Sequence, residues 1–221
     1  MKKVLVIAPH PDDETLGCGG TLIRHKLEGD KIYWLIVTGI KREDGWASET
    51  IESRKKQIEL VSTVYSCEDI FDINLPTMKV DNILTSELVD RIAEIHRQIE
   101  PDIIYMPFVN DVHSDHQLIA KAVQANVKWF RFPYVKEVLS YETLSETDFN
   151  FIGDSVFRPN VFVDISNHIN EKIQTMKIYK NEIGEHPFPR SERAIRALST
   201  LRGAQSGFDA AEAFQMVYLR R

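Results

Sequence analysis

Two short segments of the sequence concentrate residues that bind metals and transfer protons. The first is His10-Pro11-Asp12-Asp13-Glu14 and the second is Asp111-Val112-His113-Ser114-Asp115-His116. Together they hold three of the seven histidines of the chain and five carboxylates. Carboxylates that lie close together repel each other and lose solvation unless a cation sits among them, and a divalent metal is the simplest such cation. We therefore expect a metal centre if the fold brings the two segments together.

The residue types favour a catalytic metal over a structural one. The only cysteines, Cys18 and Cys67, form no pair at the spacing of a structural zinc site. A catalytic zinc site uses three nitrogen or oxygen ligands and leaves a position open for water. His10 and Asp13 lie three residues apart across a turn that enters a helix, so both can face one metal, and a histidine of the second segment would be the third ligand. Asp12 and the other polar residues of the second segment then remain for acid and base chemistry.

The elements that must position these segments alternate regularly along the chain. Apolar runs predict buried strands at 4–8, 32–37, 70–73, 102–107, 135–141 and 161–165. Helical patterns lie between and after them, at 15–28, 49–65, 85–100, 117–129, 170–179 and 191–201. This rhythm predicts an α/β fold with an open, mostly parallel, Rossmann-like sheet and helices on both faces, which we expect to form a single domain over residues 1–221. Ligands of such sheets bind at the carboxyl ends of the strands, where both polar segments begin.

Composition excludes several classes of function. The 221 residues include 27 Lys and Arg against 33 Asp and Glu, and the resulting charge of −6 disfavours non-specific nucleic-acid binding. No apolar run is long enough to insert into a membrane, and the start of the chain does not resemble a signal peptide. We expect a cytoplasmic protein whose partner is a small-molecule or glycoconjugate substrate. A homo-oligomer is compatible with the sequence.

The two segments and their surroundings resemble a known family. His10 to Glu14, preceded by Val4 to Ala8 and followed by Thr15-Leu16-Gly17-Cys18-Gly19-Gly20-Thr21, and the later His113 to His116, are similar to the PIG-L/LmbE-like zinc-dependent N-acetylglucosaminyl deacetylases. The stretch with Pro189-Arg190-Ser191, Arg202-Gly203, Gly207 and Ala211-Glu212-Ala213-Phe214 also resembles that family, although less distinctively. The resemblance therefore covers nearly the whole chain.

The resemblance implies a role for each polar residue. It implies that zinc is bound by three residues: His10, Asp13 and His116. Asp12 would be the general base that takes a proton from the attacking water.

The resemblance extends to groups around the metal. His113 would stabilise the oxyanion, and Asp115 would hydrogen-bond His113 to keep it oriented and protonated. An arginine that holds sugar hydroxyls in the family corresponds to Arg54, although the acidic residue usual three positions later is Gln57 here. Aromatic residues near predicted loops are candidates for stacking on a sugar ring: Trp46, Trp129, Phe130, Phe132, Tyr134 and Phe188.

The expected function is removal of the acetyl group from an N-acetylglucosamine-type amino sugar within a larger conjugate, with Zn²⁺ or, given the same ligand types, Fe²⁺. The main alternative is an amidase acting on another amide, such as a thiol conjugate. A non-haem Fe(II) oxygenase also uses two histidines and a carboxylate, but that triad is usually built on an all-β barrel. A non-enzymatic sugar-binding protein would not need the intact set of polar groups. A dinucleotide-binding loop is excluded because its third glycine would fall at Leu22.

Overall fold

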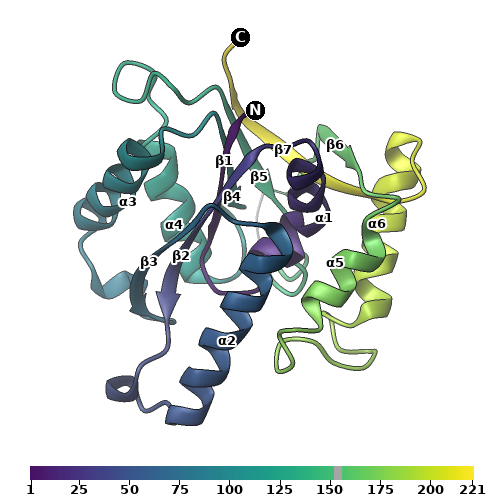
Figure 1. The fold of residues 1–221 in the computed structure, drawn as a ribbon, viewed down its shortest axis with the longest axis horizontal. Helices are drawn as coiled ribbons and strands as arrows, with labels where there is room; N and C mark the ends of the chain where they lie inside the picture. Colours follow the sequence, from purple (N-terminus) through teal and green to yellow (C-terminus); the bar gives the residue numbers. More distant parts are fainter. Residues whose placement is uncertain (152–155) are drawn as a thin grey trace.

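The computed structural model describes residues 1–151 and 156–221. Strands and helices alternate through most of the chain, as the apolar runs predict (Figure 1). The strands are β1 (Lys3–Ala8), β2 (Lys31–Gly39), β3 (Asp69–Pro76), β4 (Ile103–Pro107), β5 (Glu137–Tyr141), β6 (Val161–Asp164) and β7 (Ala211–Leu219). The α-helices are α1 (Asp13–Leu27), α2 (Ser48–Tyr65), α3 (Thr85–Ile99), α4 (Ser114–Ala125), α5 (Ile169–Met176) and α6 (Glu192–Ser206), with single 3₁₀ turns at Arg42–Asp44 and Val80–Asn82.

The described strands form one open sheet in the order β3-β2-β1-β4-β5-β7-β6. The first five strands in this order are mutually parallel, whereas β7 runs antiparallel to both β5 and β6. The mostly parallel α/β sheet predicted from the sequence is confirmed. The chain moves outward from β1 to β3 and then returns to place β4 on the other side of β1, which makes the β1–β4 edge the topological switch point where open α/β sheets bind ligands.

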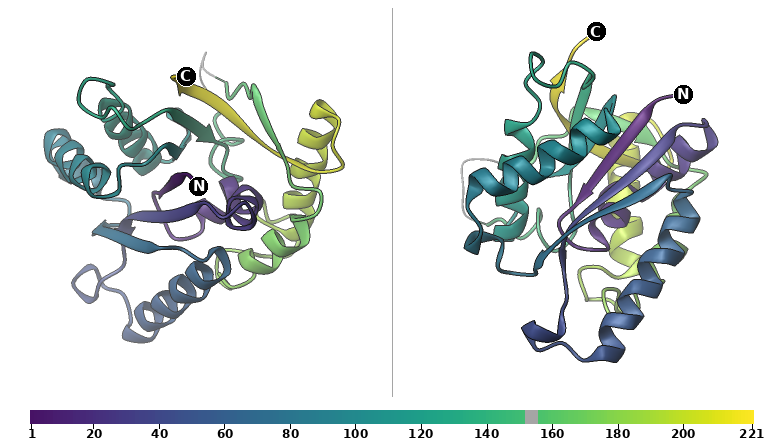
Figure 2. Two further views of the ribbon diagram at one scale, coloured as in Figure 1. Left: turned by 45° about the horizontal axis from the view of Figure 1, so that its top comes forward. Right: turned by 60° about the vertical axis from the view of Figure 1, so that its left-hand side comes forward.

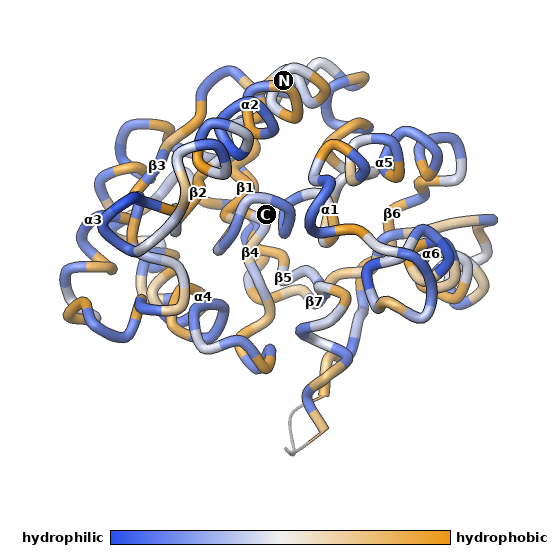
Figure 3. The backbone as a smooth tube through the Cα atoms, turned by 90° about the horizontal axis from the view of Figure 1, so that it is seen from below, coloured by the Kyte–Doolittle hydropathy of each residue, from blue (hydrophilic) through white to orange (hydrophobic). Residues whose placement is uncertain are grey.

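Helices cover both faces of the sheet. On one face α3 and α4 pack against a core that contains Leu5, Ile7 and Ile104. On the other face α1, α2, α5 and α6 pack against a core that contains Val4 and Val6. Successive residues of β1 thus point to opposite cores, so the strand is buried on both sides. Two further views show the same separation of the helices (Figure 2), and the apolar strand segments lie between the two helical layers (Figure 3).

Helix α1 approaches the sheet unusually closely. A Cβ atom added at Gly17 would lie 2.3 Å from the ring of Tyr141, and one added at Gly20 would lie 2.7 Å from Ile165. The helix is interrupted at Cys18, whose φ is −145°. The glycines that resemble a dinucleotide-binding loop therefore serve close packing beneath the turn that contains His10 to Glu14.

The structure differs from the sequence prediction in the presence of one strand and in the bounds of several elements; helix α6, for example, ends at Ser206 instead of 201. Strand β7 is absent from the prediction because the buried Glu212 interrupts its apolar pattern; its carboxylate accepts bonds from the backbone N–H groups of Gly20 and Thr21 and from Lys172. Helix α4 spans 114–125 instead of 117–129, because the His113 side chain caps it by accepting the N–H of residue 115. The earlier start places His116 in the first turn of the helix.

Candidate active site

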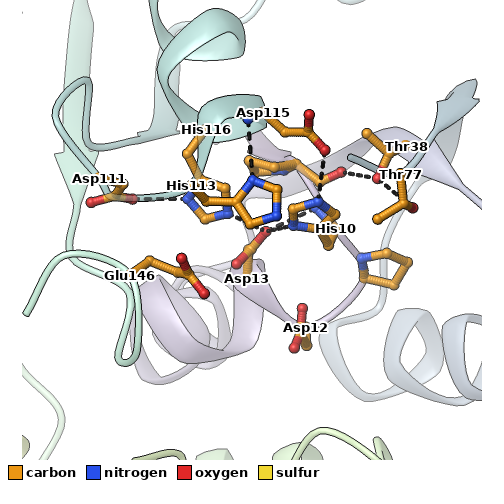
Figure 4. Close-up of polar contacts among 12 residues, drawn as sticks. His10, Asp12, Asp13, Thr38, Thr77, Asp111, His113, Asp115, His116 and Glu146 are labelled. Carbon is orange, nitrogen blue, oxygen red and sulfur yellow. Dashed lines mark hydrogen bonds and ion pairs between the residues drawn. The ribbon is translucent and has the colours of Figure 1, made fainter. Parts of the chain in front are cut away.

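The two polar segments meet at the switch point. Residues 10–14 follow β1, residues 111–116 follow β4, and these strands are hydrogen-bonded neighbours in parallel register. Three imidazole rings gather there around the carboxylate of Asp13 (Figure 4). The ring centroids of His10 and His113 lie 4.6 Å apart, and those of His113 and His116 lie 5.3 Å apart. The structure thus brings together the residues that the sequence predicts for the metal centre.

Three groups converge on one point in this cluster. The Oδ2 atom of Asp13 lies 3.3 Å from Nδ1 of His10 and 3.2 Å from Nε2 of His116. The same oxygen accepts the backbone N–H of His10 at 2.8 Å, which fixes the turn. Asp13 and His116 are buried, and His10 is half-buried at the pocket wall. The possible ligand atoms of these two imidazoles and one carboxylate all lie within 4.8 Å of one another. They match the donor set of a catalytic metal site that keeps one position open.

Each of these imidazoles has a carboxylate behind it. Nδ1 of His116 lies 2.8 Å from Oδ2 of Asp111, and Nε2 of His10 lies 3.1 Å from Oδ2 of Asp115. Metal-binding histidines commonly donate their second N–H to such a carboxylate, which orients the ring. The sequence prediction gave Asp111 no role. Its position as the first residue of the second polar segment was the available signal, but only the tertiary structure shows which imidazole it contacts.

The sequence prediction is wrong about the hydrogen-bond partner of the Asp115 carboxylate. The sequence predicts that the Asp115 carboxylate hydrogen-bonds His113 and keeps it protonated, whereas the carboxylate contacts His10 and the backbone N–H of Met78. Nδ1 of His113 instead accepts the backbone N–H of Asp115 at 3.1 Å. Burial and the neighbouring His10 and His116 lower the pKa of His113 to about 4, so its ring is neutral, with the proton on Nε2. A neutral ring in this tautomer still offers one hydrogen-bond donor.

The electrostatics of the convergent groups fit a cation. Burial alone would oppose a charged ring, but hydrogen bonds to Asp115 and Asp13 raise the pKa of His10 to about 9. Burial likewise opposes charge on His116, yet Asp13 and Asp111 raise its pKa to about 10. Burial would raise the pKa of Asp13, but the two rings hold it well below its usual range. The carboxylates therefore stabilise positive charge at this point. Protons on His10 and His116 provide that charge here, and a metal ion can provide it in their place.

A buried nitrogen that makes no hydrogen bond supports the same conclusion. Nε2 of His116 is buried and, within the described residues, makes no hydrogen bond, although it lies 3.2 Å from Asp13. A buried polar atom without a partner is costly unless it serves a ligand. The donor set and this orphaned nitrogen fit a metal held by His10, Asp13 and His116.

Asp12 lies beside this cluster on the opposite side of the turn. Its carboxylate is buried and accepts a bond from Nη1 of Arg190 at 2.9 Å. Burial, followed by the charges of Asp13 and Glu182, raises its pKa well above the ordinary value. Such a group suits proton transfer near neutral pH. Arg190 has no assigned role in the sequence prediction, although it belongs to the carboxyl-terminal stretch that resembles the family.

Arg54 reaches the same turn. Its Nη1 donates to the carbonyl oxygen of Pro11 at 2.8 Å, and its Nη2 lies 2.5 Å from Oε1 of Glu182. Glu182 also lies 3.3 Å from Arg190 and so joins the two arginines. Gln57, three positions after Arg54, carries no carboxylate, and the carboxylate partner of Arg54 is Glu182.

These side chains form one end of a pocket of about 320 Å³. Its polar lining includes Asp12, Arg54, Glu182 and Arg190. Its apolar lining includes Ile36, Ile40, Trp46, Ile51 and Ile58. Of the aromatic candidates for sugar stacking, Trp46 lines this pocket and is 45% exposed, whereas Phe132 is buried in the core. The volume suits one sugar ring with part of its attached group.

Comparisons with known proteins agree with this geometry. The chain is 28% identical over 235 residues to a diacetylchitobiose deacetylase from Thermococcus kodakarensis, and the match covers 98% of this chain and 84% of that protein. Among solved structures, the conserved protein TT1542 from Thermus thermophilus is similar with a TM-score of 0.80 and 26% identity, over 100% of this chain and 97% of that one.

The fold by itself does not fix the chemistry. A 4-carboxy-2-hydroxymuconate hydratase, GalB from Pseudomonas putida KT2440, has a similar fold with a TM-score of 0.75, at 15% identity over 100% of this chain and 98% of that one. Its similarity shows the fold alone. The sequence match is more specific, because the family model described as PIG-L, GlcNAc-PI de-N-acetylase, matches residues 5–127, which include both polar segments. The chain therefore belongs to the PIG-L family of N-deacetylases.

Proposed function

We propose that this protein removes the acetyl group from an N-acetylglucosamine-type amino sugar within a larger conjugate, using a metal held by His10, Asp13 and His116. The observation that carries the proposal is the placement of the buried Asp12 carboxylate in the same pocket as this open ligand set. Metal-assisted hydrolysis of an amide uses both a metal and a base at one carbonyl. The relationship to a diacetylchitobiose deacetylase supports the choice of an acetylated amino sugar.

A divalent metal at this position would supply Lewis acidity and lower the pKa of a water molecule beside it. Asp12 accepts the proton of the attacking water and then carries it to the leaving amine. The Nε2–H of His113 donates to the oxygen of the scissile carbonyl as negative charge develops there, which is the largest single contribution in many acyl transfers. Asp115 and Asp111 orient the rings of His10 and His116.

Two nitrogens and one carboxylate oxygen favour Zn²⁺, and Fe²⁺ accepts the same donors. The pocket beyond the metal supports binding of a sugar. The carboxylate of Glu182 can accept hydrogen bonds from sugar hydroxyls, and the guanidinium groups of Arg54 and Arg190 can donate hydrogen bonds to them. The ring of Trp46 offers an apolar face for the sugar ring. Arg54 is proposed to contact substrate in addition to its bonds to Pro11 and Glu182.

The test is acetate release from a panel of N-acetylglucosamine conjugates by zinc-reconstituted protein, with metal content measured on every sample. We expect Asp12→Asn to keep its metal and to lose about 10²- to 10⁴-fold in kcat, the usual contribution of a general base. Asp209→Asn, the same substitution at an exposed aspartate that does not line the pocket, is the matched control and should match wild type.

Two results would contradict the proposal. Full activity in Asp12→Asn would remove Asp12 as the base. A metal-loaded wild type that releases no acetate but cleaves a thiol-conjugate amide would favour the amidase alternative, which uses the same polar groups with a different leaving group.

A further inference from the structure

The turn between β1 and α1 contains a peptide in an unusual orientation. Asp12 has φ 142° and ψ −27°. The value of ψ is already helical, because the Asp12 carbonyl accepts the N–H groups of Thr15 and Leu16 at 3.0 and 2.9 Å. A φ of this size is rare for a residue with a side chain. The strain therefore lies in φ, the rotation about the N–Cα bond of Asp12. The orientation of the Pro11–Asp12 peptide sets this angle.

This peptide has a relaxed alternative. Rotation of the peptide plane by about 180° would bring φ of Asp12 to about −40°, near the right-handed helical region that its ψ already occupies. Pro11 does not oppose the rotation, because a proline ring fixes its own φ and leaves both extended and helical ψ values accessible. Something other than local backbone preference must hold the observed orientation.

Both polar ends of this single peptide are held by side chains. The carbonyl oxygen of Pro11 accepts a bond from Nη1 of Arg54 at 2.8 Å. The N–H of Asp12 donates to Oε2 of Glu14 at 3.0 Å. Rotation of the peptide would break both bonds and turn the carbonyl oxygen toward the Glu14 carboxylate, which it would repel.

Glu14 is itself fixed on all sides. Its side chain is fully buried, and Oε1 accepts from the hydroxyls of Thr15 at 2.5 Å and Tyr179 at 2.9 Å. The Thr15 hydroxyl lies 2.7 Å from that of Tyr65 and has already given its proton to Glu14, so Tyr65 donates to Thr15. Tyr65 ends α2 and Tyr179 follows α5. The network ties the turn to two helices of one layer and leaves Glu14 only acceptor roles.

We propose that Glu14, together with Arg54, holds the Pro11–Asp12 peptide in its strained orientation and thereby aims the Asp12 carboxylate into the pocket. Glu14 is thus a positioning residue for the base. Strained backbone that persists beside a reactive group commonly serves the geometry of that group. The role of Asp12 as base rests on the proposed function, whereas the clamp on the peptide does not.

The experiment compares Glu14→Ala, Glu14→Gln and Tyr105→Phe with wild type. Glu14→Ala removes the acceptor, and we expect kcat to fall about 100-fold, with KM and metal content nearly unchanged, because a displacement of about 1 Å costs that much. Glu14→Gln keeps an amide oxygen for the Asp12 N–H and can place its NH₂ group against the two hydroxyl oxygens, so we expect kcat within about tenfold of wild type. Tyr105→Phe, the matched control, removes a buried hydroxyl that bonds His25 and lies outside this network, so it should leave kcat within about threefold.

Crystal structures of the same variants give a readout that does not depend on the reaction. We expect φ of Asp12 to become negative in Glu14→Ala and to stay positive in Glu14→Gln. A positive φ with wild-type kcat in Glu14→Ala would overturn the proposal, as would a Glu14→Gln protein as impaired as Glu14→Ala. If Glu14→Ala does not fold, Glu14→Leu, which fills similar space without offering an acceptor, takes its place with the same expected results. If the wild type releases no acetate, the proposed function fails while φ still decides the clamp.

Discussion

Metal binding should expel two protons from the candidate site. The pKa values of His10 and His116, about 9 and about 10, keep both rings protonated at pH 6 to 7, while Asp13 is already ionised. A metal binds only the deprotonated rings, so a rise in pH favours the metal. With two protons released, the apparent affinity for Zn²⁺ should increase about 100-fold per pH unit, or about 2.7 kcal/mol.

The assay is calorimetric titration with Zn²⁺ between pH 6 and 7, in non-coordinating buffers that differ in ionisation enthalpy. The proton count is taken at the pH 6 end of this range, about one unit below the pKa of about 7 expected for zinc-bound water, where the water adds little. All proteins carry Asp12→Asn, because the raised pKa of Asp12 could otherwise contribute a third proton.

Two further substitutions identify which rings release the protons. His116→Gln should release at most one proton and bind zinc far more weakly. His113→Gln is the matched control: its ring has a pKa of about 4 and is already neutral, so the variant should still release two. An affinity that does not change between pH 6 and 7, or a proton lost with His113 instead of His116, would refute the assignment of ligands.

Three further predictions concern the pocket, the packing beneath it and the acid stability of the fold. Glu182→Gln removes the charge that joins two arginines of the pocket wall, and we expect KM to rise about tenfold in the acetate-release assay, with a smaller change in kcat; an unchanged KM would contradict a role in binding. Gly17→Ala would place a methyl group 2.3 Å from the buried Tyr141 ring, and urea unfolding should show a loss of about 3 kcal/mol or more, whereas a loss below about 1 kcal/mol would show that the ring moves aside. Burial lowers the pKa of His96 to about 4, below its unfolded value, so its contribution to stability is present above about pH 6.5 and lost as the pH falls toward 4. Urea unfolding at pH 7 and pH 5 measures how much stability the protein loses on acidification. In His96→Leu this loss should be smaller by about 2 kcal/mol than in wild type, and an equal loss would show that His96 does not contribute to it.

The sequence by itself determined the elements and the kind of chemistry. Uninterrupted apolar runs such as 4–8 and 103–107 can be buried on both faces only in a sheet covered by helices, so the α/β class follows from local pattern. Histidines and carboxylates directly after two such runs indicated a metal centre, because few other arrangements make that density of charge stable. Strand β7 escaped this reasoning because the compensation for its buried Glu212 comes from Lys172 and from α1, far away in sequence.

Only the tertiary structure decided how these groups pair. The strand order placed β4 beside β1, which no local pattern specifies, and so brought His116 to Asp13. It also decided that the Asp115 carboxylate contacts His10 instead of His113, and that Asp12 meets Arg190, 178 residues away. Such contacts join side chains over long separations, and their geometry depends on the packing of whole elements. Local sequence can determine which residues stand at the end of a strand, but only the assembled sheet determines which neighbours they meet there.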